Sequence, residues 1–119
     1  MKMNINAMEI ERTRARIRDT AQSMLDGKCC YIEGARRICD MLEEARLDRF
    51  DKPFVTFVVI ASETDEVPVG HLRDRWHPET KITLASKWTH AERYAKKLGE
   101  VACRDAVTWL AAYPSFAIR

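Results

Sequence analysis

The segment Phe54–Ala61, with the sequence FVTFVVIA, constrains the fold more than any other part of the chain. Its β-branched and aromatic residues favour a strand, but its apolar positions also fit one face of a helix. A strand needs a neighbour to satisfy its backbone hydrogen bonds, and no comparable β-rich run occurs elsewhere. The sequence therefore predicts a buried helix over about Pro53–Thr64, with a strand as the alternative.

Two stretches that precede this segment carry apolar residues at helical spacing. The first, Ala7–Leu25, predicts a helix that ends before Gly27, a residue suited to a positive φ. The second predicts a helix over about Cys30–Leu47, and the DRFDKP stretch of residues 48–53 marks its end. The two helices are expected to form an antiparallel hairpin whose apolar stripes need further partners.

The last third of the chain predicts one long helix. Apolar residues keep helical spacing from Trp88 to about Ala112, and Thr89 with Glu92 has the pattern of a capping box near the start. The preceding stretch, Lys81–Ser86, is poor in helix-forming residues and predicts a loop.

One further helical element and the absence of linkers complete the expected fold. His71–Trp76 predicts two helical turns, which Pro78 stops because the residue before a proline avoids helical angles. No repeat and no Ser-, Gly- or Pro-rich linker divides residues 1–119, so we expect a single domain. The predicted fold class is all-α, an irregular bundle of four to five helices, with the first and last helices on either side of the 54–61 segment.

Charge is distributed unevenly along the chain. The formal net charge is +2, from 20 basic and 18 acidic side chains, which gives no overall field to hold a nucleic acid or an anionic membrane. Residues 43–79, however, carry nine acidic and five basic groups between two net positive flanks. Such a segment suits a basic protein partner. The side chains expected to approach that partner are Glu43, Glu44, Asp48, Glu63, Asp65, Glu66 and Asp74.

The residues able to carry chemistry lack the spacing of a known site. No two cysteines stand two to four residues apart, and no two histidines pair at i and i+4, so we expect no metal site. Ser62 has no Gly-flanked elbow and there is no Gly-rich phosphate loop, so we expect no catalytic residue and no cofactor. The four arginines between residues 12 and 18 spread around the solvated side of their helix, so we expect no direct contact with nucleic acid.

The N-terminal residues and the cysteines bear on the compartment. Met1–Ala7 lacks the apolar stretch of a secretory signal, and the longest strongly apolar run is too short to cross a bilayer, so we expect a cytoplasmic protein. In that reducing compartment the cysteines are expected to be buried free thiols, with two disulfides as the alternative. They are Cys29, Cys30, Cys39 and Cys103.

Residues 60–76, IASETDEVPVGHLRDRW, depart most from a generic helix-bundle sequence. One interpretation is structural: Ser62 and Thr64 bond the end of a helix, Arg73 folds back onto a carboxylate and Trp76 closes the core. With the earlier IEGARRI, residues 32–38, this stretch also resembles a family of small uncharacterised helical proteins of proteobacteria.

The members of that family read approximately IEGARRI followed by SETDxLPxGxxRxxW, and the likeness covers about residues 30–78 of this chain. The motif residues to which it points are Glu33, Arg36, Arg37, Ser62, Arg73 and Trp76. Its small, stand-alone members resemble immunity or accessory proteins of bacterial toxin systems, such as those of contact-dependent inhibition.

We therefore expect a binding protein that neutralises a cognate toxin, with a basic nuclease as the leading candidate, by covering its active site. The second hypothesis is a structural or regulatory module that forms a homodimer through an exposed helix stripe. A third is an enzyme that uses the region of Glu63 and Asp65 with His71 and Arg73.

Overall fold

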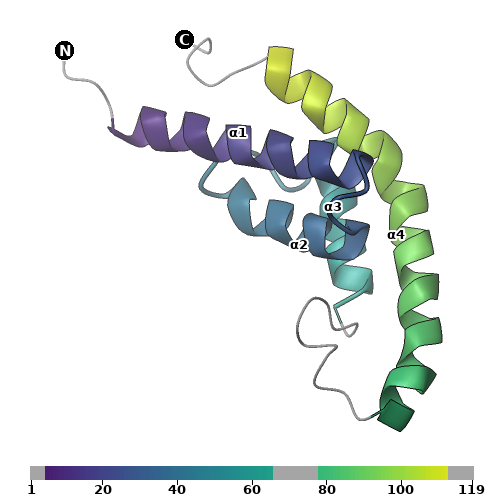
Figure 1. Cartoon of the computed structure of the whole chain (residues 1–119). Helices are drawn as coiled ribbons and strands as arrows, with labels where there is room; N and C mark the ends of the chain where they lie inside the picture. The colour runs from purple at the N-terminus through teal and green to yellow at the C-terminus, as the bar shows by residue number, and fades with distance from the viewer. Residues whose placement is uncertain (1–4, 66–77, 113–119) are drawn as a thin grey trace.

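The computed structural model describes residues 5–65 and 78–112 of the chain. They form four helices: α1 (Ile5–Leu25), α2 (Tyr31–Leu42), α3 (Phe54–Glu63) and α4 (Pro78–Ala112). No strand occurs in these two ranges, and the helices pack around one core (Figure 1). The predicted all-α class is confirmed. His71–Trp76, predicted to be helical, lies outside the described residues.

The 54–61 segment is a helix, as its lack of a pairing partner predicts. Within α3, Phe54, Phe57 and Ile60 are buried, with Phe57 and Ile60 completely enclosed. Their spacing of three residues places them on one face, which packs against α2 and α4. Burial of these large side chains outweighs the modest helix propensity of a β-branched run.

The connection between α1 and α2 follows the prediction at Gly27. This residue has a φ of 77°, and the N–H of Lys28 donates to the carbonyl of Ser23 at 2.9 Å, which closes the end of α1. Further along, a Cβ on Gly34 would stand 2.3 Å from Sδ of Met24, so the lack of a side chain lets α2 approach α1 closely.

The second helix was expected to end at about Leu47. In the structure α2 ends earlier, at Leu42. Arg46 has a left-handed φ of 57°, its N–H donates to Glu43 O at 3.0 Å, and the N–H of Leu47 donates to Leu42 O at 3.0 Å. This pattern is a Schellman ending, which usually carries glycine at the left-handed position. Because arginine rarely takes this position, nothing in the sequence indicated that the helix ends here.

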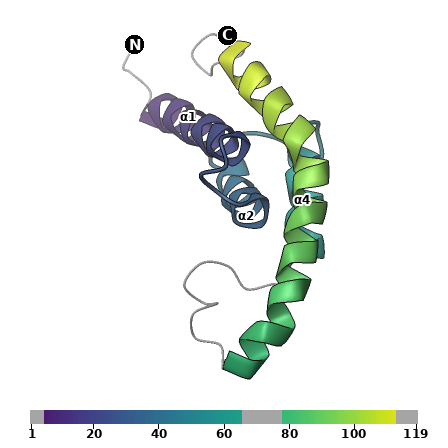
Figure 2. The same cartoon turned by 45° about the vertical axis from the view of Figure 1, so that its right-hand side comes forward.

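The stretch Lys81–Ser86 was predicted to be a loop, and that prediction is wrong: it belongs to α4. Pro78 stands at the start of this helix, where its fixed φ is favourable. Poor helix formers cost a few tenths of a kcal/mol each, less than nucleating a separate helix after them. Figure 2 shows α4 running well past α1 and α2 at its N-terminal end.

The capping box predicted at Thr89 and Glu92 is also wrong, because both residues lie inside α4. The hydroxyl of Thr89 donates to Ala85 O at 2.9 Å, within its own helix. Glu92 instead reaches the start of α2, as described below.

The arrangement of the helices differs from the expectation that α1 and α4 flank α3. The helices that pack closely on α3 are α2 and α4, whereas α1 packs mainly against α4 and α2. The core therefore draws on all four helices, with Ile17 of α1, Ile38 of α2, Phe57 of α3 and Cys103 of α4 each fully buried.

Candidate functional site

The structure divides the predicted partner-binding residues into two groups at opposite ends of α3. The first group lies on the end of α2 and the connection to α3 and is exposed: Glu43, Glu44 and Asp48. The second group, Glu63 and Asp65, lies at the C-terminal end of α3 and is also exposed. Glu66 and Asp74 lie outside the described residues, as do the motif residues Arg73 and Trp76.

Carboxylates are the most common charged groups around the first group, at the end of α2. The end of α2, the connection up to Lys52 and the facing part of α1 form one surface, which we call the α2–α3 surface; two adjoining hollows on it share Asp40 and Glu43. Six exposed acidic side chains line the hollows and the connection against three exposed basic ones, and Arg12 of α1 adds a fourth cation, which pairs with Glu9 at 3.8 Å. The acidic residues are Glu9, Asp40, Glu43, Glu44, Asp48 and Asp51, and the basic residues are Arg46, Arg49 and Lys52. The α2–α3 surface is therefore net negative.

An aromatic side chain stands beside these carboxylates. Phe50 is 76% exposed, more than any other large apolar side chain among residues 5–65 and 78–112 for which burial is defined. Leaving a phenylalanine in water forgoes about 1.5–3 kcal/mol of burial, so it contributes little to this fold. Exposed aromatic residues are typical anchors of protein interfaces. The only sequence signal for it is a lone aromatic residue within the polar stretch DRFDKP.

The backbone that presents Phe50 is held by hydrogen bonds. The N–H of Phe50 donates to Oδ1 of Asp48 at 2.8 Å, and the N–H of Asp51 donates to the carbonyl of Asp48 at 3.1 Å. Leu47 and Pro53 are buried on either side of this stretch. A connection fixed at both ends loses little conformational entropy when a partner binds.

Arg14 of α1 holds the start of the same connection through two hydrogen bonds. Its Nε donates to Ala45 O at 2.8 Å and its Nη2 to Arg46 O at 3.3 Å. The side chain is only 8% exposed, with its guanidinium carbon 5.8 Å from the ring centroid of Trp109. Burial lowers the pKa of Arg14. The prediction that this arginine belongs to the solvated side of its helix is wrong, because α1 turns it towards the end of α2.

In the second predicted group, Glu63 is tied into the fold. The hydroxyl of Tyr94 on α4 donates to a carboxylate oxygen of Glu63, and this hydrogen bond raises the pKa of Tyr94. Arg36 of α2 donates to Thr64 O, while the hydroxyl of Thr64 donates to Ile60 O at 2.6 Å. These contacts give Glu63 and Arg36 structural roles at the end of α3, where Ser62 is exposed.

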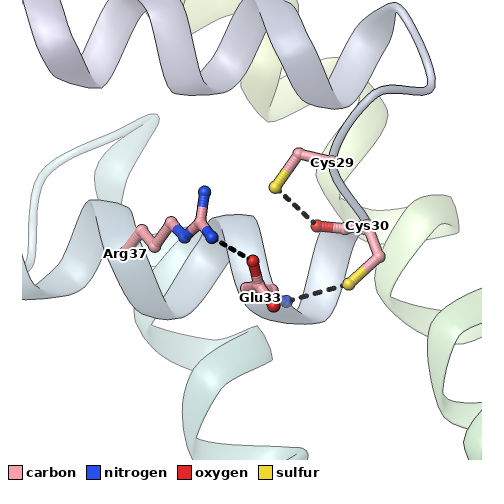
Figure 3. A network of polar contacts seen from close by, with 4 residues as sticks. All are labelled: Cys29, Cys30, Glu33 and Arg37. Atoms are coloured by element: carbon pink, nitrogen blue, oxygen red, sulfur yellow. Dashed lines mark hydrogen bonds and ion pairs between the residues drawn. The ribbon is translucent and has the colours of Figure 1, made fainter. Parts of the chain in front are cut away.

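Further motif residues serve the start of α2 (Figure 3). Sγ of Cys30 accepts a hydrogen bond from the N–H of Glu33 at 3.4 Å, and the Glu33 carboxylate pairs with Arg37 one turn later. Glu92 of α4 completes this end: its two oxygens accept from the N–H groups of Tyr31, at 2.7 Å, and Ile32, at 3.0 Å. A carboxylate at a helix N-terminus satisfies unpaired donors and opposes the positive end of the helix dipole.

The four cysteines are free thiols, of which Cys103 is buried and the others half-buried. Burial raises the pKa of all four, to about 11 for Cys39 and about 12 for Cys103. At neutral pH these groups are therefore protonated and poor nucleophiles. In the described part of the chain, no three His, Cys, Asp or Glu side chains gather as metal ligands would.

Comparison with known proteins adds no relative. The chain matches no known family model, no curated protein and no solved structure. Within the described ranges, no helix combines the length and apolarity needed to span a bilayer.

Proposed function

We propose that this chain is a non-catalytic binding protein that docks a basic protein partner on its α2–α3 surface. The observation that carries the proposal is the exposed Phe50 set among carboxylates on a hydrogen-bonded connection. The aromatic ring offers an apolar anchor, and the carboxylates offer complementarity to a basic surface. Of the two predicted groups, the proposal selects Glu43, Glu44 and Asp48, because Glu63 already engages Tyr94.

The partner we propose is a toxin, with a basic nuclease as the leading candidate, and the protein acts as its immunity protein in the cytoplasm. Two observations support this choice. The IEGARRI and SETD motifs resemble those of a family of small helical proteins whose stand-alone members resemble immunity or accessory proteins of toxin systems. A net negative surface can also occupy the groove in which a nuclease binds phosphates, since its carboxylates substitute for that charge.

The charge of the surface is tested by paired variants against the purified proteins encoded beside the gene. We expect one of these proteins to bind, and E43Q/E44Q to slow its association about threefold to tenfold at low salt, with a smaller effect at high salt. The matched control is E63Q/D65N, which removes two carboxylates from the other end of α3 and should leave the association rate unchanged. Stopped-flow or biosensor kinetics measure both.

Three outcomes would contradict the proposal: no binding to any of these proteins, equal slowing by both pairs, or slowing by E63Q/D65N alone.

Light scattering of the isolated chain distinguishes the proposed binding protein from the homodimer hypothesis. We expect a monomer mass at every concentration, and a mass that doubles with concentration would favour the homodimer.

A further inference from the structure

Arg14 is a buried cation with no acidic partner among the described residues. Its side chain is 8% exposed, and the acceptors on its Nε and Nη2 are the uncharged carbonyls of Ala45 and Arg46. Its Nη1 is closed to water and has no hydrogen-bond acceptor in the described ranges. The face of Trp109 offsets part of the charge. A buried cation without a carboxylate is costly, so it favours a negative charge nearby.

A pocket of about 510 Å³ lies against this arginine. Two more cations, Arg46 and Lys52, line it together with Arg14, and its apolar lining includes Phe54 and Trp109. The two rings pack edge to face with their centroids 5.7 Å apart. The volume is in the range of small-molecule sites and larger than a bare phosphate needs.

Two carboxylates, Asp48 and Asp51, also line the pocket. Both are exposed, and Oδ1 of Asp48 is engaged by the N–H of Phe50. The lining therefore holds three cations and two anions, with the least exposed charge, Arg14, positive. The lining has one more positive than negative charge, which favours an anion, and the two carboxylates compete with that anion.

We propose that this pocket binds a small molecule that carries one oxyanion, a phosphate or a carboxylate, next to an apolar group. The oxyanion lies at the Arg14, Arg46 and Lys52 side and the apolar group against Phe54 and Trp109. The pocket adjoins the proposed docking surface and shares Asp48 and Asp51 with it, but Arg14, Phe54 and Trp109 belong to the pocket alone, so its test uses the chain without the partner.

The test uses phenyl phosphate and benzoate as probes, with inorganic phosphate and chloride at matched ionic strength as references. We expect saturable NMR shifts of the Arg14 Nε–H and Trp109 indole N–H signals, with millimolar affinity, and the better of the two probes identifies the oxyanion. Inorganic phosphate should bind more weakly than phenyl phosphate. Absence of saturable shifts, or shifts that chloride reproduces, would overturn the proposal.

Three folded surface variants give a signed check. K52Q removes a lining cation and should weaken binding about twofold to fivefold, the range of an exposed ion pair. D51N removes a competing carboxylate and should strengthen binding by a similar factor. R49Q makes the same charge change as K52Q on the same connection, but Arg49 does not line this pocket, so it should have no effect. Equal effects of K52Q and R49Q would overturn the site.

Discussion

Replacement of Glu92 by alanine should lower the free energy of unfolding by about 2–3 kcal/mol, because two charge-assisted hydrogen bonds are lost together. The N–H groups of Tyr31 and Ile32, at the first turn of α2, lose their acceptors, and the helix loses a negative charge at its positive end. The contact also joins α4 to α2 across about 60 residues of sequence. Urea denaturation followed by circular dichroism measures the effect.

Two variants make the Glu92 result specific. E92Q offers only one carboxamide oxygen, so it should recover part of the loss. E100A removes another glutamate of α4, whose described pairing is a 3.8 Å ion pair with Arg104, and should change stability by no more than about 0.5 kcal/mol. If E92A is as stable as the unmodified protein, the two hydrogen bonds do not hold α2 to α4.

Truncation of Phe50 should weaken partner binding by about 2 kcal/mol, which is about 30-fold in the dissociation constant. The side chain is 76% exposed, so the same variant, F50A, should unfold within about 0.5 kcal/mol of the unmodified protein. Calorimetric titration with the partner and urea denaturation measure the two quantities separately. Loss of affinity without loss of stability is the signature of an interface anchor.

The matched control for F50A is V101A on α4. Val101 is 58% exposed, so this change also trims an exposed apolar side chain, but on a helix away from the connection. It should leave affinity unchanged. If F50A binds as tightly as the unmodified protein, or V101A weakens binding as much, Phe50 is not the anchor.

The position of α3 could be predicted from the sequence by elimination. Residues 54–61 have the composition of a strand, but a strand without a partner leaves its backbone groups unpaired, and a buried helix does not. The end of α1 was equally predictable, because Gly27 takes the positive φ that few other residues tolerate. The rule at Gly27 is local, whereas residues 54–61 are decided by the lack of a β-rich pairing partner elsewhere in the chain.

Two helix ends could not be predicted, one because a tertiary contact decides it and the other because an existing helix continues through weak helix formers. Arg46 takes the left-handed position at the end of α2, where Arg14 from another helix donates to Ala45 O and Arg46 O. The weak helix formers of Lys81–Ser86 continue α4 because they extend an existing helix. Amino-acid composition indicates neither the left-handed conformation of Arg46 nor the continuation of α4.

The candidate site was predictable in its charge and not in its anchor. The surplus of acidic residues after position 42 pointed to seven carboxylates, of which the fold gathers Glu43, Glu44 and Asp48 on one surface and places Glu63 and Asp65 at the other end of α3. Exposure of Phe50 depends on where the connection leaves the core, which sequence periodicity does not report. The same holds for Arg14, whose burial follows from its packing against Ala45, Arg46 and Trp109.

Hydrogen–deuterium exchange of the complex tests most directly which surface the partner covers. The chain is measured alone and with saturating partner, and the amides of residues 40–52 are compared with those of residues 62–65 and of α4. We predict slower exchange on binding across residues 43–52, with residues 62–65 and α4 unchanged. Slower exchange confined to residues 62–65 and α4, with none across the connection, would contradict docking on the α2–α3 surface.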